Sequence, residues 1–149
     1  MSARIEAICT SSKKGVVKTP VDQAELRVKH GIVGDAHAGD WHRQISLLAT
    51  ESIAKMKVIL PDLPDGAFAE NVVVSGMELK SLPIGTKLTL GATVLEVTQI
   101  GKECHQGCAI REATGDCVMP REGIFCKVIE GGTIRPGDSV SAVSDFPGM

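Results

Sequence analysis

Four of the five cysteines lie close together, at Cys104, Cys108, Cys117 and Cys126. The thiolate is the form of cysteine that attacks electrophiles and binds soft metals, and neighbouring cations favour it. Lys102 and His105 flank Cys104 within the polar stretch that also contains Cys108. Because Cys104 and Cys108 are four residues apart, their sulfurs would share one face of a helical turn. That arrangement would permit joint ligation of a metal or relay of sulfur between the two.

Three interpretations of this segment remain open. The first is a reactive or cofactor-ligating thiol at Cys104 or Cys108, with Cys117 as a resolving thiol that closes a disulfide after sulfur transfer. The second is a zinc site, although the spacing C-x₃-C-x₈-C lacks the usual C-x₂-C pair. The third is burial of cysteine as a small hydrophobic residue. The third suits Cys9 and Cys126, which lie in apolar strand-like stretches, and we expect both to be inert.

Two further segments contain candidate binding residues. Residues 30–44 (HGIVGDAHAGDWHRQ) are rich in glycine and histidine and show no periodicity. They predict a long loop, in which Arg43 could bind a phosphate through two hydrogen bonds and His37 could border a ligand. Asn71 directly precedes a β-branched run and could hydrogen-bond a heterocycle or a neighbouring loop. Solvated loop residues would give the same pattern.

Short alternating or β-branched segments, separated by glycine and proline, predict a chain built mainly from strands. The expected strands are residues 4–10, 16–21, 24–28, 44–48, 70–75, 87–90, 93–100, 123–129 and 139–143. One principal helix is expected at about 52–60, capped by Thr50 or Ser52 and ended by Pro61. The sequence therefore predicts a mostly β fold, a closed or partly closed barrel, formed by residues 1–149 as a single domain. The cysteine segment is a long connection between two expected strands, and such loops usually carry function.

Charge and hydropathy exclude other classes of protein. The net charge is −2 and there is no long basic run, so the pattern typical of nucleic-acid binding is missing. No apolar run approaches the ~20 residues that a membrane helix needs. The first residues lack the apolar stretch of a signal peptide. We therefore expect a cytoplasmic protein, and the sequence does not indicate its oligomeric state.

The order and spacing of these motifs resemble the MOSC family, named for the C-terminal domain of molybdenum cofactor sulfurase. The resemblance covers nearly the whole chain, roughly Ile5 to Val143. Its motifs are GIVGD followed by RQISLL and TES, then FAEN with LPIG, then the cysteine segment with GIF and GTIRPGD. The short stand-alone bacterial members are the most similar subgroup.

The resemblance implies a barrel of complex topology that binds the molybdenum–pterin cofactor or carries sulfur as a persulfide. Cys108 matches the family's molybdenum-ligating cysteine best, and Cys104 is the rival. Arg43, Lys102 and Arg121 would neutralise the cofactor phosphate, and His37 and Asn71 would border the site. Proteins that donate or accept sulfur or the cofactor would be the partners. The alternative is a zinc-bound module, without enzymatic activity, that docks on molybdoenzyme biosynthesis proteins.

Overall fold

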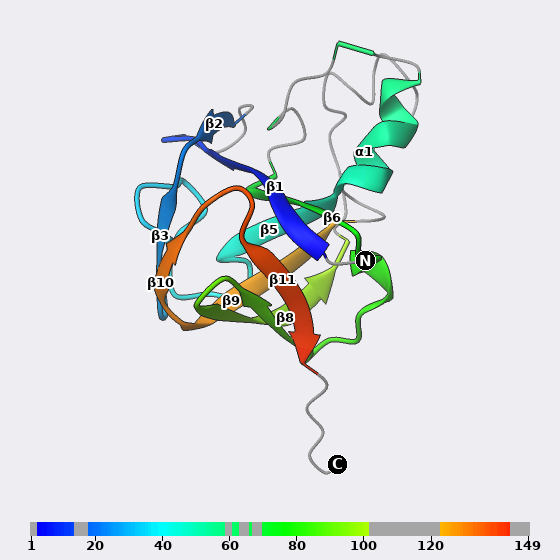
Figure 1. Cartoon of the computed structure of the whole chain (residues 1–149). Helices are drawn as coiled ribbons and strands as arrows, with labels where there is room; N and C mark the ends of the chain where they lie inside the picture. Colours follow the sequence, from blue (N-terminus) through cyan, green and yellow to red (C-terminus); the bar gives the residue numbers. More distant parts are fainter. Residues whose placement is uncertain are drawn as a thin grey trace.

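A barrel of seven strands dominates the part of the chain that the computed structural model describes, which is residues 3–13, 18–58, 61–62, 66, 70–101 and 123–143. The barrel strands follow the order β11-β7-β8-β9-β5-β6-β1, and pairing of β11 with β1 closes the wall (Figure 1). Their bounds are β1 (Ala3–Thr10), β5 (Ile45–Ala49), β6 (Val72–Ser75), β7 (Lys87–Leu90), β8 (Thr93–Ile100), β9 (Ile124–Glu130) and β11 (Ser139–Val143). This confirms the predicted mostly β barrel.

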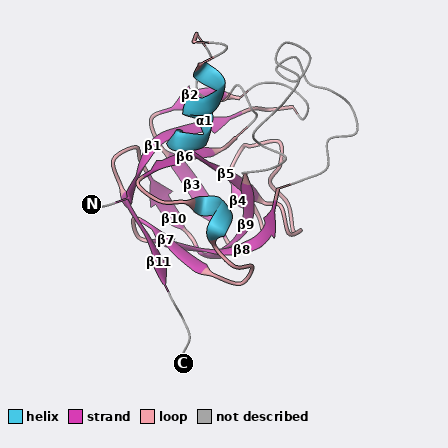
Figure 2. Ribbon diagram, turned by 90° about the vertical axis from the view of Figure 1, so that its right-hand side faces the viewer, coloured by secondary structure: helices cyan, strands magenta, loops and turns pink. Residues whose placement is uncertain are grey.

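Smaller elements complete the fold. Strand β2 (Thr19–Val21) pairs with the outer edge of β1, and β10 (Gly132–Ile134), β3 (Ala24–Arg27) and β4 (Gly31–Ile32) form a separate three-stranded sheet. A 3-10 helix, η1 (Leu79–Ser81), lies between β6 and β7. Helix α1 (Thr50–Lys57) connects β5 to β6, which pair in parallel, and it lies outside the barrel wall (Figure 2). No helix in the described residues is long and apolar enough to cross a bilayer.

Alternation of side chains along the strands divides them between two apolar layers. In β5, Ile45, Leu47 and Ala49 point into the barrel core, whereas Ser46 and Leu48 are equally buried but belong to the other face. Since every residue of β5 is buried, the outer face of this strand is also covered. Strands β1, β6 and β9 alternate in the same way, so the wall has a buried outer side over these strands.

Two expectations about local structure were wrong. The helix begins at Thr50 because the chain passes directly from β5 into α1, and its N-cap is Ala49, with no side-chain hydrogen bond. The expected cap from Thr50 or Ser52 is therefore not formed. Strand β10 lies where the two adjacent glycines, Gly131 and Gly132, favoured a turn. Gly131 lies against β3, where a Cβ on this residue would be 2.4 Å from the carbonyl oxygen of Leu26.

Truncation of the barrel core tests the placement of β5. Leu47 is fully buried at the centre of this strand, so Leu47→Ala should lower the free energy of unfolding by about 2–5 kcal/mol. Ile84, whose side chain is exposed, provides the control, and Ile84→Ala should change that free energy by less than about 0.5 kcal/mol. Urea unfolding measures both. Equal effects of the two substitutions would contradict the described core.

Candidate functional site

A buried ion pair joins two segments that are far apart in the sequence. The ammonium of Lys18, just before β2, lies 2.8 Å from Oδ1 of Asp35, in the loop after β4, and both side chains are fully buried. Removing two charges from water costs several kcal/mol per ion unless further hydrogen bonds satisfy them. The surroundings of this pair therefore decide whether it can exist.

Ser11, after β1, and His37, in the same loop as Asp35, supply the missing hydrogen bonds. The Ser11 N–H donates to Oδ1 of Asp35 (3.1 Å) and the His37 N–H donates to Oδ2 (3.0 Å), while the Lys18 ammonium also donates to the Ser11 hydroxyl (3.0 Å). Burial by itself would raise the pKa of Asp35, but Lys18 and these two N–H groups outweigh burial and lower the pKa below its ordinary value. The carboxylate therefore stays charged and holds Ser11, Lys18 and His37 together.

Like Ser11, His37 is a partly exposed member of this cluster. Its ring Nδ1 lies 3.8 Å from Oδ2 of Asp35, and its side chain is 26% exposed. The arrangement places a partly accessible imidazole beside a carboxylate that hydrogen bonds hold in position.

Arg43 lies on the same loop, between two aromatic rings. Its guanidinium carbon is 4.8 Å from the centre of the Trp41 ring and 5.6 Å from that of Phe125. The Trp41 indole N–H donates to the backbone oxygen of His37 (2.8 Å), which links this stack to the ion-pair cluster. The Nε of Arg43 is buried and has no hydrogen-bond partner among the described residues. A cation held in this way retains donor capacity for an anionic ligand.

Asn71, which directly precedes β6, links three strands through its side chain. Its Oδ1 accepts hydrogen bonds from the Ser46 N–H (2.9 Å) and hydroxyl (3.2 Å), and its Nδ2 donates to the backbone oxygen of Cys9 (3.1 Å). Asn71 is fully buried. In the structure its side chain therefore joins β5 and β1 to the start of β6.

Residues 102–122, which contain Cys104, Cys108 and Cys117, leave and re-enter the barrel wall close to Phe125. The Gly101 N–H donates to the backbone oxygen of Gly123 (2.6 Å), so the chain leaves β8 and enters β9 at one point of the wall. Phe125, which Arg43 covers, is two residues from that point. The predicted residues Lys102, Cys104, Cys108, Cys117 and Arg121 lie outside the described residues.

His42 connects the loop of residues 30–44 to the same point. Its Nε2 lies 2.9 Å from Oε1 of Gln99, and Gln99 in turn donates to the backbone oxygen of Gly101 (2.7 Å). The Gln99 amide N–H₂ faces Gly101, so its oxygen faces Nε2 of His42. A hydrogen-bonded path therefore runs from this loop to the base of the cysteine segment.

The predicted residues thus differ in what they do. The structure brings His37 and Arg43 together through Trp41, and it places Asn71 in the strands below. Sequence reasoning missed Lys18 and Ser11, because a lysine before a short strand and a serine after one look like surface residues. Nothing local in the sequence indicates that Lys18 is buried. Its pairing depends on a loop that is 17 residues away.

The two cysteines that the structure describes are both fully buried. Burial raises the pKa of the Cys126 thiol, and the nearby carboxylate of Glu96 raises it further. Cys126 lies in the barrel core, whereas Cys9 belongs to the outer face of β1. The burial of both agrees with the expectation that neither is a reactive thiol.

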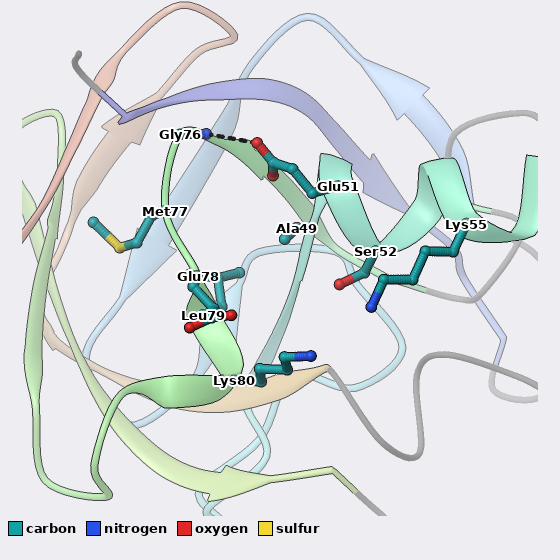
Figure 3. Close-up of a pocket in the computed structure, with 9 residues that line it drawn as sticks. All are labelled: Ala49, Glu51, Ser52, Lys55, Gly76, Met77, Glu78, Leu79 and Lys80. Atoms are coloured by element: carbon teal, nitrogen blue, oxygen red, sulfur yellow. Dashed lines mark hydrogen bonds between the residues drawn. The ribbon is translucent and has the colours of Figure 1, made fainter.

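Hollows open on the surface of the part of the chain that the structure describes. One, of about 400 Å³, lies beside the site, between Trp41, His42 and Lys127. Another, of about 360 Å³, lies between α1 and η1 (Figure 3), and its carboxylate Glu51 accepts a hydrogen bond from the Gly76 N–H (3.2 Å). His37, Arg43 and Asn71 line neither of these two hollows. The first hollow adjoins the candidate site through Trp41, on whose ring Arg43 lies.

Comparison with known protein families identifies the chain. The model of the MOSC domain matches residues 34–141, which is most of the sequence. The chain belongs to the MOSC domain family. This family is generally linked to molybdenum cofactor-related function. A search of curated proteins found no match.

Solved structures share the MOSC fold at low sequence identity. The YUAD protein from Bacillus subtilis is 22% identical with a TM-score of 0.77, and the match covers 94% of each chain. YiiM from Escherichia coli is 18% identical with a TM-score of 0.70, over 98% of this chain and 71% of that one. YiiM from Geobacillus stearothermophilus is 17% identical with a TM-score of 0.69, over 95% and 75%. These likenesses support the barrel architecture of the MOSC domain.

Single and double substitutions test the buried ion pair. Asp35→Asn leaves the Lys18 charge buried without its partner, and it should lower the free energy of unfolding by about 3–5 kcal/mol. Lys18→Met should also destabilise the protein, and the double variant should lose less than the sum of the two single losses. Glu25→Gln breaks the exposed pair between Glu25 and Arg27, and as a control it should change stability by less than about 1 kcal/mol.

The same variants carry a pH signature. Because folding lowers the pKa of Asp35 below 3.8, its stabilising contribution is present above that pH and is lost as the pH falls through the folded value. Asp35→Asn should therefore flatten the acid limb of the stability profile, measured by urea unfolding between neutral pH and pH ~3. Additive single effects, or an acid limb as steep as that of the wild type, would show that the pair is not coupled.

Proposed function

We propose that this MOSC domain binds the molybdenum–pterin cofactor, or carries sulfur for it, on the outer face of the barrel between His37 and Arg43. The observation that carries the proposal is the guanidinium of Arg43, which two aromatic rings hold with its Nε buried and without a partner among the described residues. A buried donor without an acceptor costs free energy, which an anionic ligand would recover. The phosphate of the cofactor is such a ligand.

The residues present fit this group. Arg43 would hold the phosphate, and a soft thiolate from Cys108 or Cys104 would hold molybdenum or sulfane sulfur. Lys102 and Arg121 belong to the same segment as these cysteines, which begins and ends next to Phe125, and they would add positive charge. When bound, the cofactor supplies a redox-active metal. Sulfur donor or acceptor proteins are the partners that this chemistry requires.

His37 would handle protons at this site. Its ring Nδ1 faces the Asp35 carboxylate, and the side chain is partly accessible. The fixed carboxylate orients the imidazole, so that a proton could be taken from or returned to a ligand. The fully buried Lys18 keeps the carboxylate charged and its oxygens in place. Lys18 and Asp35 would therefore act through His37 and need not touch the ligand.

The test is the metal, pterin and sulfur content of the full chain. The protein would be produced in cells that make the cofactor and purified without oxygen or chelator, and molybdenum, pterin and cyanide-releasable sulfur would then be measured. We expect molybdenum with pterin, or a persulfide, in the wild type. Arg43→Met should weaken cofactor binding about tenfold, because it removes a charged hydrogen-bond donor. Cys108→Ser and Cys104→Ser should show which thiol carries the ligand.

The control is Arg4→Met. Arg4 is exposed on β1 and bonds only Glu6 among the described residues, so this variant should bind as the wild type does. Binding by Arg43→Met equal to that of the wild type would contradict the proposed site. Stoichiometric zinc without molybdenum or sulfur would favour the zinc-bound module. No group of three possible ligands occurs among the described residues.

A further inference from the structure

Glu70 is a fully buried carboxylate that the site described above does not use. It directly precedes Asn71 at the start of β6, and its Oε2 accepts a hydrogen bond from the Gly66 N–H (2.8 Å). A fully buried polar side chain costs free energy unless it is hydrogen-bonded, so the position of Glu70 needs a reason. Asn71 already joins the neighbouring strands, which means that the sheet does not depend on Glu70 for that link.

Gly66 in turn packs directly on the backbone of Lys18. The Lys18 N–H donates to the carbonyl oxygen of Gly66 (2.9 Å). Gly66 has a φ of +88°, and a Cβ at this position would lie 2.0 Å from the carbonyl oxygen of Lys18. Only glycine permits both this conformation and this approach. The turn at Gly66 therefore fixes where the main chain of Lys18 lies.

The contacts of Lys18 complete a continuous path. From its backbone at Gly66, the side chain extends to Asp35 (2.8 Å), and the other oxygen of Asp35 accepts the His37 N–H (3.0 Å). We propose that Glu70 is a positioning residue, which holds Gly66 against the backbone of Lys18 and thereby sets the Lys18 ammonium on Asp35, beside His37. It acts through two intervening residues and need not touch a ligand.

This inference deepens the proposed function. It rests on that function only for the identity of the ligand on which His37 acts. The placement of Lys18 can be measured in the full chain without any cofactor, by the rate at which a small acylating reagent modifies each lysine at neutral pH. The exposed Lys127 is the internal reference. If the cofactor experiment fails, the labelling result for Lys18 still stands. If the labelling result fails, the cofactor experiment is not affected.

In the wild type, Lys18 should react far more slowly than Lys127, because its side chain is fully buried and ion-paired. Glu70→Ala should raise the Lys18 rate, relative to that of Lys127, by about tenfold or more through local opening. Glu70→Gln should stay close to the wild type, since its amide oxygen can accept the Gly66 N–H. If Glu70→Ala does not fold, Glu70→Asp replaces it, because the shorter carboxylate withdraws from Gly66.

A general loss of stability is controlled by Leu95→Ala, which removes a fully buried side chain from the barrel interior. This variant should raise the relative rate at Lys18 by less than Glu70→Ala does, because it increases global unfolding without opening the contact at Gly66 locally. The proposal is overturned if Glu70→Ala labels Lys18 no faster than Leu95→Ala does. It is also overturned if Glu70→Gln exposes Lys18 as much as Glu70→Ala, because the hydrogen bond to Gly66 would then not be the cause.

Discussion

The ion pair between Lys18 and Asp35 is the interaction on which the arrangement of the site depends. A charge pair with no access to water is tolerated only when every remaining donor and acceptor is satisfied. Three segments satisfy the donors and acceptors of this pair: the end of β1, the residue before β2 and the loop after β4. The requirement converts three separate segments into one rigid corner. His37 owes its position beside a carboxylate to that corner.

The barrel provides the support for this corner in a specific way. Interior side chains of β5 fill the core, while its outward side chains, with those of β1, β6 and β9, form a second buried layer. Asn71 locks the strands of that layer, and the guanidinium of Arg43 lies against its aromatic edge at Phe125. The cysteine segment leaves and re-enters the wall at the same edge. One side of the barrel therefore carries three features: the Arg43 guanidinium, His37 beside the Asp35 carboxylate, and the ends of residues 102–122, which contain three cysteines.

The sequence predicted the parts of the structure that local pattern determines. Strands β7, β8 and β11 have the expected bounds, because each alternates clearly and ends at a glycine or proline turn or at a chain end. Strand β10 was missed because adjacent glycines favour a turn, whereas Gly131 packs closely on Leu26 and Gly132 faces Thr93. The burial of Lys18 could not be predicted, since it results from contacts made across the fold. His37 and Arg43 were found because glycine-rich loops with such residues often bind ligands.

Amide hydrogen exchange in the wild-type protein tests the central claim most directly. Ser11 and His37 are not in regular strands, yet their N–H groups donate to the buried carboxylate of Asp35. If the ion pair organises the site, both amides should exchange far more slowly than those of an exposed loop, at rates that approach global unfolding. Two-dimensional NMR after transfer to D₂O measures this residue by residue. Exchange of both amides at the rate of an unstructured peptide would contradict the account.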